Sequence, residues 1–273
     1  MSREATMNQV KNLEENYTII LGAEGELGRA MAREVARKGC NLLLVSTTLV
    51  DLQRFAIGLQ LTEEVQVEAV KLHLSDQEAI QQFIHAVRDG YEVRALINNI
   101  TCDWSVEFNR CVSELAREDF MTRFRGAALI TWSLLPQMSK LSSSYIQHII
   151  PFPFKKEQFS AELQHSVSKM YAFARELDGE LKESTVSVSI MHPAPIRSLL
   201  PETDETTGLN VTDSVASPAS IAEKGIQGML RGDRLIIPGF WNRIYFFLNK
   251  QATSWFRSSR GSWESTSSLQ PSV

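Results

Sequence analysis

The sequence predicts a single α/β domain, built as a three-layer αβα sandwich around a parallel sheet of about seven strands. Short β-branched or Leu-rich runs alternate with longer amphipathic stretches, which is the pattern of βαβ units. The chain has 273 residues, of which 43% are hydrophobic. This is ample material for one core, whereas a second full domain is not expected.

Seven short apolar runs are expected to form the strands of this sheet. Each run is rich in β-branched residues or Leu and is followed by a longer stretch that suits a helix. The expected strands are Thr18–Leu21, Asn41–Ser46, Val67–Leu72, Ala95–Asn98, Tyr145–Ile150, Val186–Met191 and Leu235–Ile237.

Helices are expected to fill the gaps between the strands, and two of them carry terminal signals. From Leu27 to Lys38 apolar residues recur at helical spacing, and Gly39 is a good C-terminal cap. Ser75 and Glu78 predict a capping box that opens a helix to Arg88.

The predicted domain covers residues 17–257. A polar extension of residues 1–16 precedes it, and a Ser-rich tail of residues 258–273 is expected to be disordered. Residues 199–218 are polar, acidic and rich in Thr and Ser, which predicts a long mobile loop near a substrate.

Composition excludes several classes of function. The 28 basic and 32 acidic residues give a net charge of −4, so no broad basic surface for nucleic acid is expected. The N-terminal residues lack an apolar leader and no run of 18 apolar residues occurs, which disfavours secretion and membrane spanning. Cys40, Cys102 and Cys111 lack metal-ligand spacing, so we expect reduced thiols, no metal site and a cytoplasmic protein.

One glycine-rich segment carries the main functional signal. Gly22, Gly25 and Gly28 are spaced by three residues between an apolar strand and an amphipathic helix. Glycines permit a tight turn and a close backbone approach, and a helix that opens at Leu27 offers N–H groups and a positive dipole end to a pyrophosphate. This context predicts a dinucleotide-binding loop.

Two carboxylates border this loop. Glu24 and Glu26 would repel a pyrophosphate unless they point to solvent or pair with Arg29 or another cation.

Three motifs in the correct order resemble the short-chain dehydrogenase/reductase family, from about Tyr17 to about Phe247. The resemblance implies a single-domain Rossmann-type fold and an NAD(P)-dependent oxidoreductase. The motifs are Gly22-x-x-Gly25-x-x-Gly28, which has the spacing of the family's extended and atypical branches; Asn98-Asn99, which starts its Asn-Asn-Ala-Gly motif; and His192–Ser198, which is similar to its Pro-Gly-x-Val-x-Thr segment beside the nicotinamide.

The resemblance implies NADP or NAD as the cofactor. An NADP-preferring member usually has a basic residue just after the second strand, and an NAD-preferring member has an acid at the end of that strand. This chain has Ser46, Thr47 and Thr48 there, so the preference stays open. The positions implied to contact the cofactor are Gly22, Glu24, Gly25, Leu27, Gly28, Thr47, Asn99, Lys169, Pro193, Ile196 and Ser198.

The resemblance also assigns catalytic positions. The family uses a Tyr for proton transfer, a Lys four residues later, a Ser that orients the carbonyl and an Asn that supports a proton relay. Alignment places His165 at the Tyr, Lys169 at the Lys, Pro151 and Phe152 near the Ser, and Arg123 at the Asn. Only Lys169 is retained, so His165, Lys169 and Arg123 are the candidate catalytic residues.

The replacement of Tyr by His165 changes the acid–base chemistry. Residues four apart on a helix share a face, so Lys169 is expected near the imidazole. A nearby cation lowers the pKa of a phenol toward neutrality, which helps a Tyr, but it lowers the pKa of an imidazolium below its ordinary value of about 6.5. Lys169 therefore disfavours His165 as an acid, while a neutral His165 serves as a base or a hydrogen-bond donor.

Structural interpretations of these residues stay open. His165 is either a proton-transfer group or a helix residue satisfied by hydrogen bonds, and Arg123 is either a solvated charge or part of an anion pocket. His148 and Tyr145 lie beside the strand that leads to the missing Ser, and strand alternation lets at most one of them face the site.

An aromatic cluster occupies residues 240–257. It packs on the core, forms a subunit interface, covers a lipophilic substrate or lies on a membrane surface. The family resemblance implies a homodimer or homotetramer in which this segment shapes the substrate pocket.

These observations lead to two main hypotheses. The first is a divergent NAD(P)(H)-binding oxidoreductase that acts on a small lipophilic carbonyl or alcohol without the usual Tyr, Ser and Asn. The second is a repurposed fold, either a non-redox enzyme or a pseudoenzyme that binds a ligand or a protein partner. A third hypothesis gives the aromatic segment a peripheral membrane role.

Overall fold

A single parallel sheet of seven strands forms the centre of the molecule. The computed structural model describes residues 17–100, 114–150, 161–193, 217–239 and 243, with only the backbone of residues 114–119 and 161–166. The strands lie in the order β3-β2-β1-β4-β5-β6-β7, and every adjacent pair is parallel. They are β1 Tyr17–Leu21, β2 Asn41–Ser46, β3 Val67–Lys71, β4 Val93–Asn98, β5 Ser144–Ile149, β6 Val186–Met191 and β7 Leu235–Ile236.

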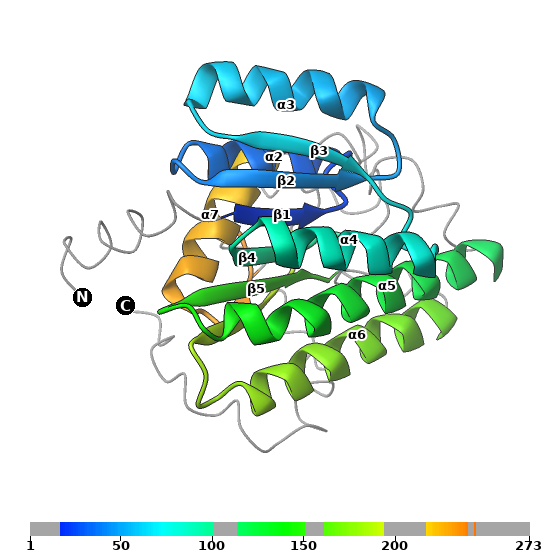
Figure 1. Cartoon of the computed structure of the whole chain (residues 1–273). Coiled ribbons are helices and arrows are strands. Elements are labelled where there is room, and N and C mark those ends of the chain that lie inside the picture. Colours follow the sequence, from blue (N-terminus) through cyan, green and yellow to red (C-terminus); the bar gives the residue numbers. More distant parts are fainter. Residues whose placement is uncertain (1–16, 101–113, 151–160, 194–216, 240–242, 244–273) are drawn as a thin grey trace, which may run out of the picture.

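Helices cover both faces of the sheet, as the sequence predicts (Figure 1). In the described part of the chain they are α2 Glu26–Ala36, α3 Val50–Glu63, α4 Gln77–Gly90, α5 Glu114–Met138, α6 Ala161–Glu180 and α7 Pro218–Arg231. The first core cluster joins α2, α3 and α7 to one face of the sheet, and the second joins α4, α5 and α6 to the other. The predicted three-layer α/β architecture is therefore confirmed.

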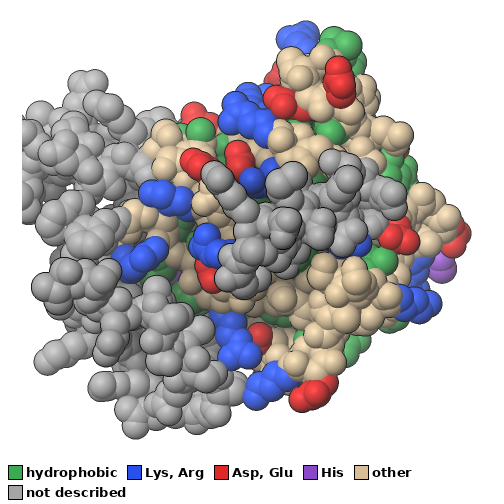
Figure 2. Space-filling view, turned by 90° about the vertical axis from the view of Figure 1, so that its left-hand side faces the viewer, with side chains coloured by type: hydrophobic (Ala, Val, Ile, Leu, Met, Phe, Trp, Pro, Cys, Tyr) green, Lys and Arg blue, Asp and Glu red, His purple; other side chains and the backbone are tan. Residues whose placement is uncertain are grey.

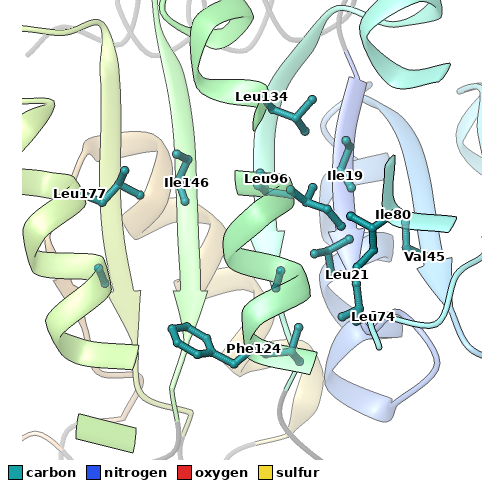
Figure 3. Packing of buried hydrophobic residues seen from close by; sticks show 14 of the residues in the cluster. Ile19, Leu21, Val45, Leu74, Ile80, Leu96, Phe124, Leu134, Ile146 and Leu177 are labelled. Carbon is teal, nitrogen blue, oxygen red and sulfur yellow. The ribbon is translucent and has the colours of Figure 1, made fainter. Parts of the chain in front are cut away.

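The strands are buried on both sides because their side chains alternate between the two helical layers. Ile20 packs into the cluster with α2 and α7, whereas its neighbours Ile19 and Leu21 pack into the cluster with α4, α5 and α6. Figure 3 shows this second cluster, with Phe124 of α5 beside the carboxyl end of β5.

Of the two helix-end predictions, the cap at Gly39 is confirmed and the capping box at Ser75 is not. Gly39 has φ +77° and its N–H binds the carbonyl of Ala36 at 2.8 Å, so it caps α2 as expected. The predicted capping box of Ser75 and Glu78 is wrong. Asp76 is the N-cap of α4, and its carboxylate accepts the N–H of Ala79 at 3.0 Å, an arrangement that the positive end of the helix dipole favours.

Figure 2 views the molecule from the amino ends of the strands, opposite the edge at which the carboxyl ends lie. Lys and Arg side chains are interspersed with Asp and Glu side chains on the described part of this face. Among the helices that the structure describes, none is long and apolar enough to span a bilayer.

Two fully buried histidines lie at the carboxyl edge of the sheet. His148 belongs to β5, and His192 directly follows β6. Burial lowers the pKa of each imidazole to about 4, although the hydrogen bond between His192 and the carbonyl of Ile150 partly opposes the effect. Both rings are therefore neutral at pH 7.

Close packing around Gly126 of α5 leaves no space for a side chain. We therefore predict that alanine destabilises the protein at Gly126 but not at the loosely packed Gly58. A Cβ at Gly126 would overlap the carbonyl oxygen of Leu74 and lie 2.9 Å from Cδ1 of Ile80, whereas a Cβ at Gly58 of α3 meets nothing within 4 Å. We expect Gly126→Ala to lower the free energy of unfolding by about 1–3 kcal/mol. The control, Gly58→Ala, should raise it by up to about 1 kcal/mol. Urea denaturation measures both, and equal effects would contradict the packing argument.

The buried histidines predict a loss of stability in acid. Their folded pKa lies below the unfolded value, so their contribution is full above about pH 6.5 and is lost as the pH falls toward about 4. Between about pH 7.5 and pH 5 the loss is about 2 kcal/mol for each histidine. Urea denaturation of His148→Asn should show a weaker pH dependence than wild type over this range. The control is His85→Asn, an exposed position on α4; an equally weakened pH dependence in both variants would contradict the assignment.

Candidate functional site

The glycine loop lies where the direction of the strand order reverses. β1 sits between β2 and β4, so successive crossovers lead to opposite sides of β1. In open α/β sheets, ligands bind outside the carboxyl ends of the strands at such a switch point. The loop after β1 and the residues after β4 are therefore the expected walls of a ligand site.

The first glycine is held by a backbone constraint. Gly22 has φ +75°, a conformation that disfavours any side chain, and a Cβ there would overlap the carbonyl oxygen of Asn99. The Asn99 side chain donates to the Gly22 carbonyl at 2.9 Å, and its backbone N–H donates to the Leu21 carbonyl at 3.0 Å. Asn99, a predicted cofactor contact, thus fixes the shape of the loop.

The third glycine lets α2 approach this loop closely. A Cβ at Gly28 would overlap the Gly22 carbonyl oxygen and lie 2.9 Å from the Cα of Ala23. Leu27 beside it is buried in the core under the loop. A side chain at Gly28 would push the helix N-terminus away from the switch point.

The N-terminus of α2 has the form of an anion site. Gly25 is the N-cap and provides no side-chain cap for the first-turn amide groups, which can therefore face a phosphate. The helix begins at Glu26, one residue before the predicted start at Leu27. Glu26 itself is exposed to solvent, which removes one of the two predicted repulsions.

Glu24 does not pair with Arg29 through its carboxylate. The Arg29 guanidinium instead donates from Nε to the backbone carbonyl of Glu24 at 3.0 Å and lies over the ring of Phe55 at 5.4 Å from its centroid. Oε2 of Glu24 is buried without a hydrogen-bond partner. One carboxylate oxygen of the glycine loop is therefore buried without a hydrogen bond that would stabilise its charge.

The end of β2, where the ribose is expected, is polar and uncharged. The Ser46 hydroxyl accepts the N–H of Thr48 at 3.1 Å, and Thr47 is half-buried between them. No acidic or basic side chain at this position indicates a preference for NAD or for NADP.

A buried hydrogen-bond network joins β4, α5 and β5 directly beside the loop. Nδ2 of Asn98 lies 3.0 Å from Oγ1 of Thr131 and 3.2 Å from Nδ1 of His148, and the Thr131 hydroxyl donates to the carbonyl of Ala127 at 2.7 Å. The ring of Phe173 from α6 meets the imidazole edge to face, with centroids 5.6 Å apart. His148 thus lies buried at the carboxyl edge of the sheet, against an aromatic ring.

A second buried contact ties α6 to the ends of β5 and β6. Nδ1 of His192 lies 2.7 Å from the carbonyl of Ile150, which only accepts, so Nδ1 carries the proton. Nε2 is then the acceptor for the hydroxyl of Tyr171. Pro193 follows and is buried, whereas Ile196 and Ser198 lie outside the described residues.

The catalytic candidates are described only in part. Residues 165 and 169 belong to one helix, α6, at the predicted spacing of four. Lys169 is exposed, next to the buried Val167 and Met170, while the side chain of His165 lies outside the described residues. Arg123 of α5 is half-buried. Whether these three side chains meet stays a prediction.

The network around His148 was missed by sequence reasoning, although part of its signal was present. Tyr145 and His148 are three residues apart, so they face opposite sides of the sheet, and the structure places Tyr145 in the cluster with α2 and α7. Only the register between Asn98 and His148 and the position of Thr131 on α5 reveal that these three side chains meet. Among the described residues, no cluster of three or more His, Cys, Asp or Glu side chains forms a candidate metal site.

Known proteins with similar sequences are reductases and dehydrogenases by name. The chain is 26% identical over 251 residues to the dehydrogenase/reductase SDR family protein 7-like of Drosophila melanogaster, covering 84% of this chain and 74% of that protein. It is 26% identical over 191 residues to the very-long-chain 3-oxoacyl-CoA reductase of Kluyveromyces lactis, covering 64% of this chain but only about half, 53%, of the yeast protein.

The fold recurs among solved structures. A short-chain dehydrogenase from Sphingobium yanoikuyae in complex with NADPH superimposes with a TM-score of 0.70 at 21% identity, covering 93% of this chain and 99% of that chain. Residues 16–207, more than half of the chain, match the family model described as short chain dehydrogenase. The protein therefore belongs to the short-chain dehydrogenase family.

Proposed function

We propose that the protein is an oxidoreductase that binds NADPH or NADH at the glycine loop and acts on a lipophilic carbonyl or alcohol. The observation that carries this proposal is the constrained loop itself. Asn99 holds Gly22 in a conformation that side chains avoid, and Gly28 allows the uncapped N-terminus of α2 to reach the switch point. Backbone amides in this arrangement suit a pyrophosphate.

The relatives support the cofactor and the substrate class. The Sphingobium structure contains NADPH, and the yeast relative is named for a very-long-chain 3-oxoacyl-CoA substrate. A lipophilic carbonyl is therefore the first substrate class to test. A homo-oligomeric state, a cytoplasmic location and a membrane contact through residues 240–257 stay predictions.

The proposal gives the chain's own residues distinct tasks. A bound NAD(P)(H) would supply or accept the hydride at the substrate carbon. Lys169, exposed on α6, would hold the ribose, while His165 one turn earlier would take up the alcohol proton or donate a hydrogen bond to the carbonyl. Neutral histidine suits these tasks better than it suits the role of a strong acid, because Lys169 opposes its protonation.

A repurposed fold without redox activity is the second candidate. It is favoured by the Glu24 carboxylate, one oxygen of which is buried in the loop without a partner and would repel a pyrophosphate. Whether a dinucleotide stabilises the protein distinguishes the two candidate functions.

NADPH or NADH is expected to raise the melting temperature of the wild-type protein. A ligand at one hundred times its Kd adds about 2.7 kcal/mol of stability, which corresponds to several degrees for a chain of this size. Gly25→Asp should abolish the shift without lowering the melting temperature of the unliganded protein, because Asp is a favourable N-cap that occupies the amides a phosphate needs.

The matched control is Gly90→Asp, which places the same charge at the exposed end of α4, where a Cβ meets nothing within 4 Å. This variant should keep the nucleotide-dependent shift. A flat melting temperature for the wild type with both nucleotides would remove the oxidoreductase proposal in favour of the repurposed fold.

Reduction of NADP in the presence of long-chain alcohols, the direction in which His165 takes up the proton, is the second test. His165→Ala should lower kcat by about 10²-fold or more if this residue transfers the proton. The control is His85→Ala, an exposed position on α4, which should retain wild-type turnover. Equal kcat values for wild type and His165→Ala would contradict the role of His165.

A further inference from the structure

We propose that Arg29 and Arg33 of α2 bind the 2′-phosphate of NADP(H), so that Arg29 selects NADP(H) over NAD(H). The inference rests on the proposed function and deepens it, because Ser46, Thr47 and Thr48 at the end of β2 leave the choice of cofactor open. The basic side chains that make this choice come from a different element, α2.

The two guanidinium groups lie over one aromatic ring. Cζ of Arg29 lies 5.4 Å from the centroid of the Phe55 ring, and Cζ of Arg33 lies 4.9 Å from the same centroid. The arginines are four residues apart on α2, whereas Phe55 belongs to α3. The ring attracts each cation but leaves its charge intact, and like charges at this helical spacing repel each other. Positive charge is therefore concentrated between α2 and α3.

Neither arginine forms an ion pair with a carboxylate of the described residues. Lys38 of the same segment shows the contrast, since its Nζ lies 3.2 Å from Oε1 of Glu34. Arg29 contacts Glu24, but it donates to the backbone carbonyl and not to the carboxylate. An anionic ligand is the partner that would offset this charge.

The Arg29 guanidinium is held in a defined orientation. Its Nε donates to the Glu24 carbonyl at 3.0 Å, while the group lies over the Phe55 ring. Nη1 and Nη2 donate no hydrogen bond to the described residues. The planar fork of a guanidinium matches two oxygens of a phosphate, and a fork that is already oriented loses less conformational entropy on binding.

Backbone hydrogen bonds place this guanidinium near the end of β2. The N–H groups of Gly22 and Ala23 both donate to the carbonyl of Val45, at 3.0 and 3.1 Å, so the glycine loop contacts the end of β2. Glu24, whose carbonyl Arg29 binds, is the next residue of that loop. Arg29 is thereby attached to the loop where the loop meets β2.

The segment that follows β2 contacts the same guanidinium. β2 ends at Ser46, and α3 begins shortly afterwards at Val50 and carries Phe55. Arg29 therefore bridges the glycine loop and α3, the two elements that border the end of β2. In a dinucleotide site the adenosine ribose lies at the end of this strand, and a nearby Arg accommodates the 2′-phosphate.

The charges at this position favour NADP(H). NAD(H) has a neutral hydroxyl where NADP(H) carries a phosphate, and a site for NAD usually has a carboxylate at the end of β2 to bind that hydroxyl. The opposing charge here is that of Glu24, one oxygen of which is buried without a hydrogen bond. The guanidinium groups of Arg29 and Arg33 together outweigh this carboxylate for a phosphate ligand.

Isothermal titration of the full-length protein with NADPH and with NADH tests the proposal. For the wild type we expect the Kd of NADPH to be lower by about tenfold or more, the size of a charge-assisted hydrogen bond. Arg29→Gln should remove most of this difference by weakening NADPH, while NADH binding changes little. The matched control is Arg37→Gln, an exposed position at the end of α2, which should keep the wild-type ratio. Equal Kd values in the wild type, or equal weakening of both nucleotides by Arg29→Gln, would overturn the proposal.

Adenosine 2′,5′-bisphosphate and 5′-AMP separate this inference from the proposed function, because neither contains a nicotinamide. Tighter binding of the bisphosphate that is lost in Arg29→Gln supports the phosphate site, even if no alcohol is oxidised. Turnover with NAD, together with equal binding of the two adenosine nucleotides, would overturn the inference and leave the proposed function standing. Absence of binding by all four nucleotides would overturn both.

Phe55→Leu tests the role of the ring with both arginines in place. Loss of the ring should weaken NADPH more than NADH, because the Arg29 fork is then no longer held in its orientation. The matched control is Phe83→Leu on α4, which packs in the cluster on the other face of the sheet and should keep the wild-type ratio. The melting temperature without nucleotide verifies that each variant is folded. A folded Phe55→Leu with the wild-type ratio would contradict the proposed arrangement.

Discussion

The hydrogen bond between the Asn99 side chain and the Gly22 carbonyl is the contact on which the site depends. It joins the carboxyl ends of β1 and β4 where the strand order reverses, and it holds Gly22 at φ +75°. Gly28 can then approach the loop so closely that a single Cβ would displace it. The position of the α2 N-terminus, and with it any phosphate site, follows from this one constraint.

The two ends of the site differ in their chemistry. The glycine-loop end has a backbone geometry that suits a pyrophosphate, altered mainly by the buried Glu24 oxygen. The opposite end contains two buried imidazoles, His148 and His192, each held by hydrogen bonds to its neighbours. Burial removes their charge, so they serve as directional hydrogen-bond partners and not as cations. Proton transfer in the proposed reaction is therefore assigned to His165 and not to these two rings.

Most of the fold could be predicted from the sequence, because strands and helix ends are signalled by residues that are neighbours along the chain. Each strand was found from its apolar run, and Gly39 was found as a cap because only a glycine readily takes its positive φ. The start of α4 was predicted one residue too early, because Ser75 and Asp76 are both good N-cap residues. In the structure, Asp76 has the extended backbone of an N-cap and accepts the hydrogen bond. The candidate site was predicted at the loop, but its buried polar network was not, because Thr131 lies far from Asn98 and His148 in the chain.

The sequence by itself determined the alternation of strands and helices, the spacing of the three glycines and the uncharged end of β2. These features depend on residue type and on neighbours along the chain. The tertiary structure decided that Asn99 holds the loop, that Glu24 keeps a buried oxygen without a hydrogen bond, and that Asn98, Thr131 and His148 meet in one network. Such features depend on donors and acceptors brought together through space, and the direction of a hydrogen bond is set only when its partner is known.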